Sequence, residues 1–215
     1  MPGPDRSPVD PLLTDDLWGS SKMAQFKAFR PDVEVFGAVV LSVVDGMGEF
    51  RTMAEAILSQ HGIRKPQPEA WYPQQAWLDS FKTIAEKIGP RTLFAIGKKI
   101  LEAVEWPAWI NSLETGMKAI DINYHLRHRL NGVPMFNEQN GELTPGIGHY
   151  TYEGLTGETS AVMVCNNPYP SEFDRGIITA MGRRFKPNLE VRLDTTKPTR
   201  TKGADSCTYI IEWPA

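Results

Sequence analysis

Residues 146–167, GIGHYTYEGLTGETSAVMVCNN, decide the fold class because strand-like segments stand on both sides of a turn. The segments GIGHYTYEG and ETSAVMVCNN carry aromatic and β-branched residues, and the intervening LTG is a hairpin signal. In the second segment Ala161, Met163 and Cys165 fall at every other position, so they share one face of a strand. The stretch therefore predicts an antiparallel hairpin.

The chain beyond the hairpin predicts one helix followed by two strands. In SEFDRGIITAMGRRF (171–185) Ser171 can cap the helix, with Asp174 three residues on as a capping-box variant. The inner face of this helix is expected to hold Phe173, Ile177, Met181 and Phe185. LEVRLD and SCTYIIEWP are strand candidates, and the last strand presents on one face Cys207, Tyr209, Ile211 and Trp213. These elements predict an antiparallel β-β-α-β-β unit.

The chain before the hairpin has the residue pattern of helices. Helical spacing of apolar residues predicts helices in the segments 49–62, 74–89, 92–104 and 106–129, the last beginning at Pro107. The apolar run at 33–48 fits either a buried helix or a strand, and the proline-broken 63–73 predicts a loop. Helices followed by strands indicate an α+β fold, with an N-terminal helical half packed on the C-terminal unit.

The composition bounds the kind of protein. The 215 residues are 41% hydrophobic, with a formal net charge of −3 and a pI of about 5.8, which is typical of a globular domain and argues against nucleic acid as the main partner. No apolar run approaches the roughly 20 residues of a membrane span. Two cysteines cannot form a disulfide framework, and the start lacks the pattern of a signal peptide, so the expected compartment is the cytoplasm.

We expect one folded domain. Residues 1–30, which begin with many Pro, Asp and Ser, are expected to be a flexible or strap-like segment. Residues 31–215 then form a single α+β ligand-binding domain, with a helical half at 31–131 and a sheet half at 132–215.

Three stretches carry a resemblance to a known superfamily. VFGAVVLSVVDGMGEFRTMAEAILSQHGI is similar to the opening helical unit of the heme nitric-oxide/oxygen-binding (H-NOX) domains, and FDRGIITAMGRRF resembles their helix before the last hairpin. KGADSCTYIIEW resembles the closing strand of 4-vinyl-reductase-like sensor domains. The resemblance covers roughly residues 33–213. It implies a sensor of a hydrophobic small molecule, with an apolar pocket between the two halves, a homodimer, and a separate signalling or assembly protein as partner.

The resemblance also raises two cofactors, heme and zinc. Aligning WPAWINSLETGM with the heme-carrying helix of H-NOX domains puts Met117 where the heme-ligating histidine is expected, and the tyrosine-serine-arginine element for the heme propionates has no match. The nearest candidate ligands, His125 and His128, come two and three turns later. Vinyl-reductase-like sensors build a zinc site from cysteines near the closing strand. Here Cys165 and Cys207 are the metal candidates, without partners at ligand spacing.

The stretch NYHLRHRLNG (123–132) holds the leading candidates for ligand contact. On a continuing helix His128 lies at the edge of the apolar stripe and points inward, whereas His125 points to the rim. This pair fits an anchor for a ligand carboxylate, a metal pair, or an ordinary helix end whose dipole favours cations. The same pocket is expected to involve Met117, Tyr124, His149 and the aromatic Trp109.

An enzymatic function is the less favoured interpretation. His149 and Cys165 could face one pocket and form a reactive thiolate, or they could be a half-buried histidine and a structural cysteine. No nucleophile elbow surrounds either cysteine, and common nucleotide-binding and hydrolase motifs are missing. The alternatives to a sensor are a heme-binding gas sensor using His125 or His128, a tetrapyrrole-type reductase using Cys165 and His149, and an assembly subunit.

Overall fold

The computed structural model describes residues 25–102 and 106–215, and it has the expected α+β architecture. Its helices are α1 (Gly37–Gly46), α2 (Arg51–Gln60), α3 (Gln74–Lys87), α4 (Pro90–Glu102), α5 (Leu113–Leu126) and α6 (Ser171–Arg183). Its strands are β1 (Val33–Phe36), β2 (Trp71–Pro73), β3 (His128–Leu130), β4 (Val133–Pro134), β5 (His149–Gly157), β6 (Ser160–Asn166), β7 (Glu190–Leu193) and β8 (Cys207–Glu212).

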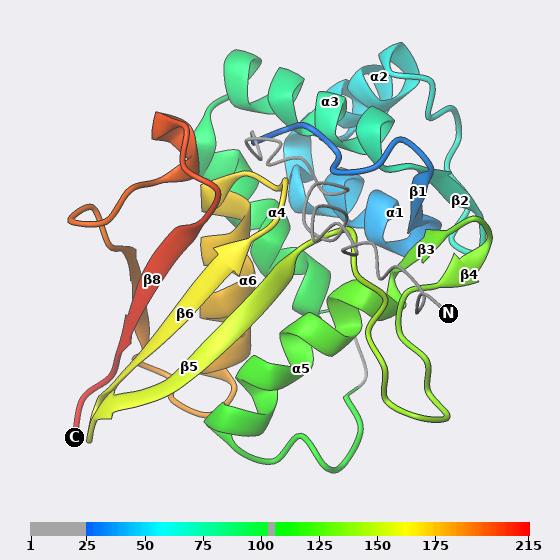
Figure 1. Ribbon diagram of the computed structural model, residues 1–215. Coiled ribbons are helices and arrows are strands. Elements are labelled where there is room, and N and C mark those ends of the chain that lie inside the picture. Colours follow the sequence, from blue (N-terminus) through cyan, green and yellow to red (C-terminus); the bar gives the residue numbers. More distant parts are fainter. Residues whose placement is uncertain (1–24, 103–105) are drawn as a thin grey trace, which may run out of the picture.

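The expected β-β-α-β-β unit forms the larger sheet, whose strand order is β5-β6-β8-β7 with every pair antiparallel. The predicted faces of β6 and β8 are confirmed, since their residues are buried in the core. The expected LTG turn is wrong, because β5 continues to Gly157 through two irregularities and reverses at residues 158–159. Figure 1 shows α4 and α6 behind this sheet, with α5 crossing below β5.

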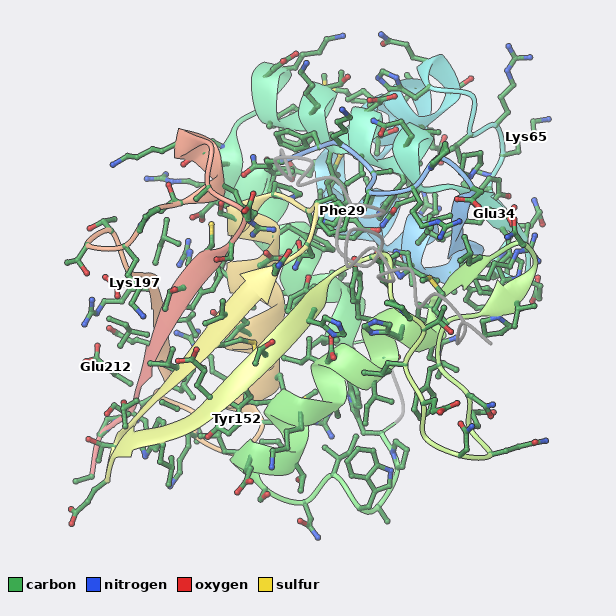
Figure 2. The ribbon with its side chains drawn as sticks, in the orientation of Figure 1. Phe29, Glu34, Lys65, Tyr152, Lys197 and Glu212 are labelled. Atoms are coloured by element: carbon green, nitrogen blue, oxygen red, sulfur yellow. The ribbon has the colours of Figure 1, made fainter. Side chains whose placement is uncertain are left out.

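A second, smaller sheet was not expected from the sequence. Its order is β2-β1-β3-β4, and it joins segments that lie far apart in the chain. The ambiguous run 33–48 becomes a strand followed by a helix, while β2 replaces part of the loop expected at 63–73. In Figure 2, Glu34 marks this small sheet, and Tyr152 and Glu212 mark the larger one.

Helix α5 is shorter than expected at both ends. It begins after Ser112, not at Pro107, because Ser112 and Thr115 form a capping box: the Ser112 hydroxyl accepts the Thr115 N–H, and the Thr115 hydroxyl accepts the Ser112 N–H. It ends at Leu126, and His128 already belongs to β3, where it stands opposite Val35. The expected helix end NYHLRHRLNG is therefore a helix-to-strand junction.

Helices α4 and α6 approach until their backbones touch, because glycines lie at the crossing. A Cβ atom added to Gly176 would lie 2.3 Å from the carbonyl oxygen of Phe94, and one added to Gly97 would lie 2.1 Å from that of Phe173. The contact locks the two halves together, since α4 belongs to the helical half and α6 covers the larger sheet.

Part of the expected N-terminal strap is visible. The Phe26 N–H donates to the carbonyl of Pro168, and the Gln75 side chain bonds the backbone of Phe26 and Ala28. Residues 1–24 of the predicted segment lie outside the described residues. Across 25–102 and 106–215, none of the helices has the length and apolar character that crossing a membrane requires.

Candidate functional site

A small cavity lies where the helical half meets the larger sheet. Its volume is about 40 Å³. Its walls are mainly apolar and come from α1, α3, α4, α5, β3, β5, α6 and the segment before α6, with the rings of Trp77, Tyr124, Tyr150, Tyr169 and Phe173 among them. A water molecule needs about 10–15 Å³ of such space. The cavity as it stands therefore has room for a few waters.

A chain of hydrogen bonds with a fixed direction crosses one wall of the cavity. The His128 Nδ1 atom lies 2.7 Å from the carbonyl oxygen of Tyr124, and because a carbonyl only accepts, Nδ1 carries the proton. The Nε2 atom then accepts the Tyr169 hydroxyl at 2.7 Å, and the Tyr169 oxygen accepts the Gln74 amide at 3.3 Å. Burial lowers the pKa of His128 to about 4 and raises that of Tyr169, so both are neutral at pH 7.

Arg127 places a cation at the same wall. It follows the last residue of α5 and lines the cavity, with its guanidinium 5.3 Å from the centre of the Phe36 ring. Burial lowers its pKa. Within the part of the chain that the structure describes, no carboxylate forms an ion pair with it. A half-buried guanidinium of this kind suits an anionic group.

A second polar cluster lies between α5 and the start of β5, and its side chains, those of Asp121, His125 and His149, do not line the cavity. Asp121 accepts the Tyr150 N–H at 2.8 Å and the His149 Nδ1 at 3.0 Å. His125, one turn after Asp121, is fully buried, with Nδ1 2.9 Å from the Asp121 carbonyl oxygen. The expected rim position of His125 is wrong, because the imidazole of His149 packs over it with ring centres 5.0 Å apart. Burial lowers the pKa of His125.

A buried ion pair replaces the expected cap of α6. The N-cap is Pro170, so the predicted capping role of Ser171 and Asp174 is wrong. Both side chains of the Asp174–Arg200 pair are fully buried, and Asp174 also accepts the Tyr150 hydroxyl at 2.6 Å. Burial alone would lower the pKa of Arg200, but the Asp174 carboxylate reverses this, so Arg200 stays charged.

The other site candidates are placed as follows. Met117 is fully buried and lies against α6 near Gly182, outside the cavity lining, whereas Trp109 is 49% exposed. Cys165 and Cys207 stand opposite each other on β6 and β8, both buried. Among the residues placed in the structure, no third histidine, cysteine or carboxylate joins them at metal-binding distance.

His149 and Cys165 are not brought together. In the hairpin register His149 pairs with Asn166, whereas Cys165 pairs with Tyr150. Neighbouring rows of an antiparallel sheet face opposite sides, so the two side chains point away from each other. Burial also raises the pKa of the Cys165 thiol, which keeps it protonated. The geometry therefore offers no activated thiolate.

Sequence reasoning identified His128 and Tyr124 at the cavity but missed Gln74, Tyr169 and Arg127. Tyr169 sits in CNNPYP, whose two prolines indicate a rigid crossover between β6 and α6. A tyrosine between two prolines could have indicated that the Tyr169 side chain is held in a fixed position. Gln74 lay at the start of a helix and carried no such signal.

The comparisons with known proteins identify the architecture. No protein-family model matches the sequence, and no curated protein matches it. Solved structures of H-NOX proteins match the fold, for example that of S. oneidensis in the Fe(II)NO ligation state, with 13% identity, 84% of this chain and 99% of that chain covered, and a TM-score of 0.56. The unliganded Fe(II) protein of K. algicida gives 10% identity, 84% and 97% coverage and a TM-score of 0.56. A variant from T. tengcongensis shares 13% identity, with 83% of this chain and 97% of that chain covered and a TM-score of 0.57. The chain therefore has the H-NOX fold.

The residues at the seam do not fit a heme group. A cavity of about 40 Å³ is far below the roughly 300 Å³ or more of sites for larger ligands. His128, the histidine in its wall, has both ring nitrogens engaged, one as a donor and one as an acceptor. Met117, which stands where the ligating histidine was expected, packs toward α6 instead.

Proposed function

We propose that this chain is a sensory, ligand-binding domain that uses its H-NOX seam for a small apolar molecule carrying a carboxylate, and not for heme. The observation that supports this most is Arg127, a half-buried cation at the wall of a mainly apolar, aromatic cavity. Ligand sites are typically apolar hollows with a few placed polar groups. The expected homodimer and the separate signalling or assembly protein stay predictions.

The ligand's two parts are matched by two parts of the wall. The rings of Trp77, Tyr124 and Phe173 offer faces and edges to an apolar body. The Arg127 guanidinium offers a charge-assisted hydrogen bond, worth about 1.5–3 kcal/mol. His128 and Tyr169 contribute less, because their hydrogen bonds are already satisfied within the protein.

A ligand larger than a few atoms must widen the cavity. Ile100 on α4 is one of the cavity-lining side chains and is only 8% exposed, so its displacement is one way to widen the cavity. A shift of α4 or of its side chains on binding would transmit occupancy to the rest of the domain.

The test compares carboxylates with their neutral amides. In calorimetric titrations with phenylacetate, indole-3-acetate and octanoate, at least one of these carboxylates should bind with a stoichiometry of one molecule per chain. The amide of that carboxylate should bind about tenfold or more weakly, a difference in binding free energy of about 1.4 kcal/mol. In Arg127→Gln the preference for the carboxylate should disappear.

The matched control is Arg129→Gln. Arg129 lies two residues on, but its guanidinium pairs with Glu34 in the small sheet at 2.6 Å, so the carboxylate preference should persist. Binding of none of the three carboxylates, or a preference that survives in Arg127→Gln, would overturn the proposal.

A further inference from the structure

Two polar side chains of α5 reach the seam cavity from one face of the helix. The residues on or directly after α5 that line the cavity include Ile120, Asn123, Tyr124 and Arg127. Their spacing of three and four residues places them on the same side. The helical turn extends as far as Arg127, because its N–H donates to the Asn123 carbonyl at 3.0 Å. The side chains of Asn123 and Arg127 therefore leave the helix about 5–6 Å apart.

The side chain of Asn123 adds an amide to the cavity wall. It is half-buried, and no group among the residues that the structure describes bonds it. An amide of this kind offers two N–H donors and one acceptor oxygen. Tyr124 differs, because its hydroxyl already donates to the Ile147 carbonyl at 2.7 Å. On this face of α5, hydrogen bonds to a ligand therefore come chiefly from Asn123 and Arg127.

The two side chains suit two neighbouring groups of one ligand. A carboxylate that lies on the Arg127 guanidinium brings the carbon atom next to it within reach of the Asn123 amide, one helical turn away. We propose that Asn123 determines the specificity of the seam by recognising a hydroxyl or amide group on that carbon atom. The inference rests on the proposed function and narrows its ligand to a 2-hydroxy acid or an N-acylated 2-amino acid with an apolar side chain.

Three different contacts around one carbon atom make binding sensitive to its handedness. The carboxylate lies on Arg127, the hydroxyl on Asn123, and the apolar group against the rings of Trp77 and Phe173 on the other side of the cavity. The mirror image of such a ligand satisfies only two of these contacts at once. One enantiomer therefore gains one more neutral hydrogen bond, which is worth about threefold to tenfold in affinity.

The test is a set of calorimetric titrations of the full-length protein with the two enantiomers of 3-phenyllactate and with 3-phenylpropanoate, which lacks the hydroxyl. The two enantiomers are hydrated equally in water, so a difference between them comes from the protein. We expect one enantiomer to bind about threefold to tenfold more tightly than the other. In Asn123→Leu, which keeps the approximate size of the side chain but removes its amide, both enantiomers should bind with equal affinity.

The matched control is Asn111→Leu, since Asn111 is exposed, precedes α5 and does not line the cavity. This variant should keep the preference of the wild type, and circular dichroism checks that both variants fold. Binding without a preference between enantiomers, or a preference that persists in Asn123→Leu, would overturn the inference and leave the proposed function standing. If none of the three carboxylates binds and those of the earlier titration also fail, the proposed function falls and this inference falls with it.

Discussion

At the scale of single residues, His128 makes the stability of the fold depend on pH. Its pKa falls from 6.5 to about 4 on folding, so the unfolded chain takes up a proton at a pH where the folded chain does not. Its contribution is fully present above pH 6.5 and is lost as the pH falls toward 4. The loss amounts to about 3 kcal/mol.

We therefore expect the free energy of urea unfolding to fall between pH 6.5 and pH 4.5, and His128→Gln to remove part of this slope. One proton corresponds to at most about 1.4 kcal/mol per pH unit. Equal slopes for the wild type and His128→Gln would show that this imidazole is not held neutral in the fold.

The Asp174–Arg200 pair makes a second prediction at this scale. Arg200→Met leaves the Asp174 carboxylate buried without its cation and should cost about 3–5 kcal/mol of unfolding free energy. The double variant Asp174→Leu with Arg200→Met should be more stable than Arg200→Met alone, since no buried charge remains.

Urea unfolding of the single and double variants measures this difference. Arg192→Met is the control, because its pair with Glu212 is at the surface, and its unfolding midpoint should stay close to the wild type. A double variant no more stable than Arg200→Met would contradict the account of the pair.

At the scale of elements, the crossing of α4 and α6 predicts that replacing a helical glycine by alanine destabilises the protein. Replacing glycine by alanine inside a helix normally stabilises it by up to about 1 kcal/mol. In Gly176→Ala the new methyl meets the backbone of α4 at 2.3 Å, so we expect a net loss of about 1–3 kcal/mol in urea unfolding. Ala95→Gly, on the exposed side of α4, measures how much helix propensity alone changes the unfolding free energy. A stabilised Gly176→Ala would mean that the helices do not touch there.

The sequence predicted the elements that carry a long apolar stripe and missed those that do not. The buried face of β8 and the core side of α6 followed from periods of 2 and 3.6 residues. Strands β2 and β3 have three residues each, too few to show a period, and their partner β1 is far away in the chain. The candidate site was predicted only in part for the same reason, since Gln74 and Tyr169 meet His128 through tertiary packing alone.

At the scale of the whole molecule, the H-NOX fold brings a helical half and a sheet half together, and side chains of this chain fill the seam between them. Trp77, Tyr124 and Phe173 line what remains, a cavity of about 40 Å³. A fold alone does not fix function. What the seam can admit depends on these side chains.

The most direct measurement is an absorbance titration of the purified protein with hemin, in the wild type and in His128→Gln. We expect no saturable one-to-one Soret complex, and whatever change hemin does cause should be the same in both proteins, because His128 has no free ring nitrogen. A one-to-one complex whose Soret band is lost in His128→Gln would contradict the account, since the seam would then be a heme pocket.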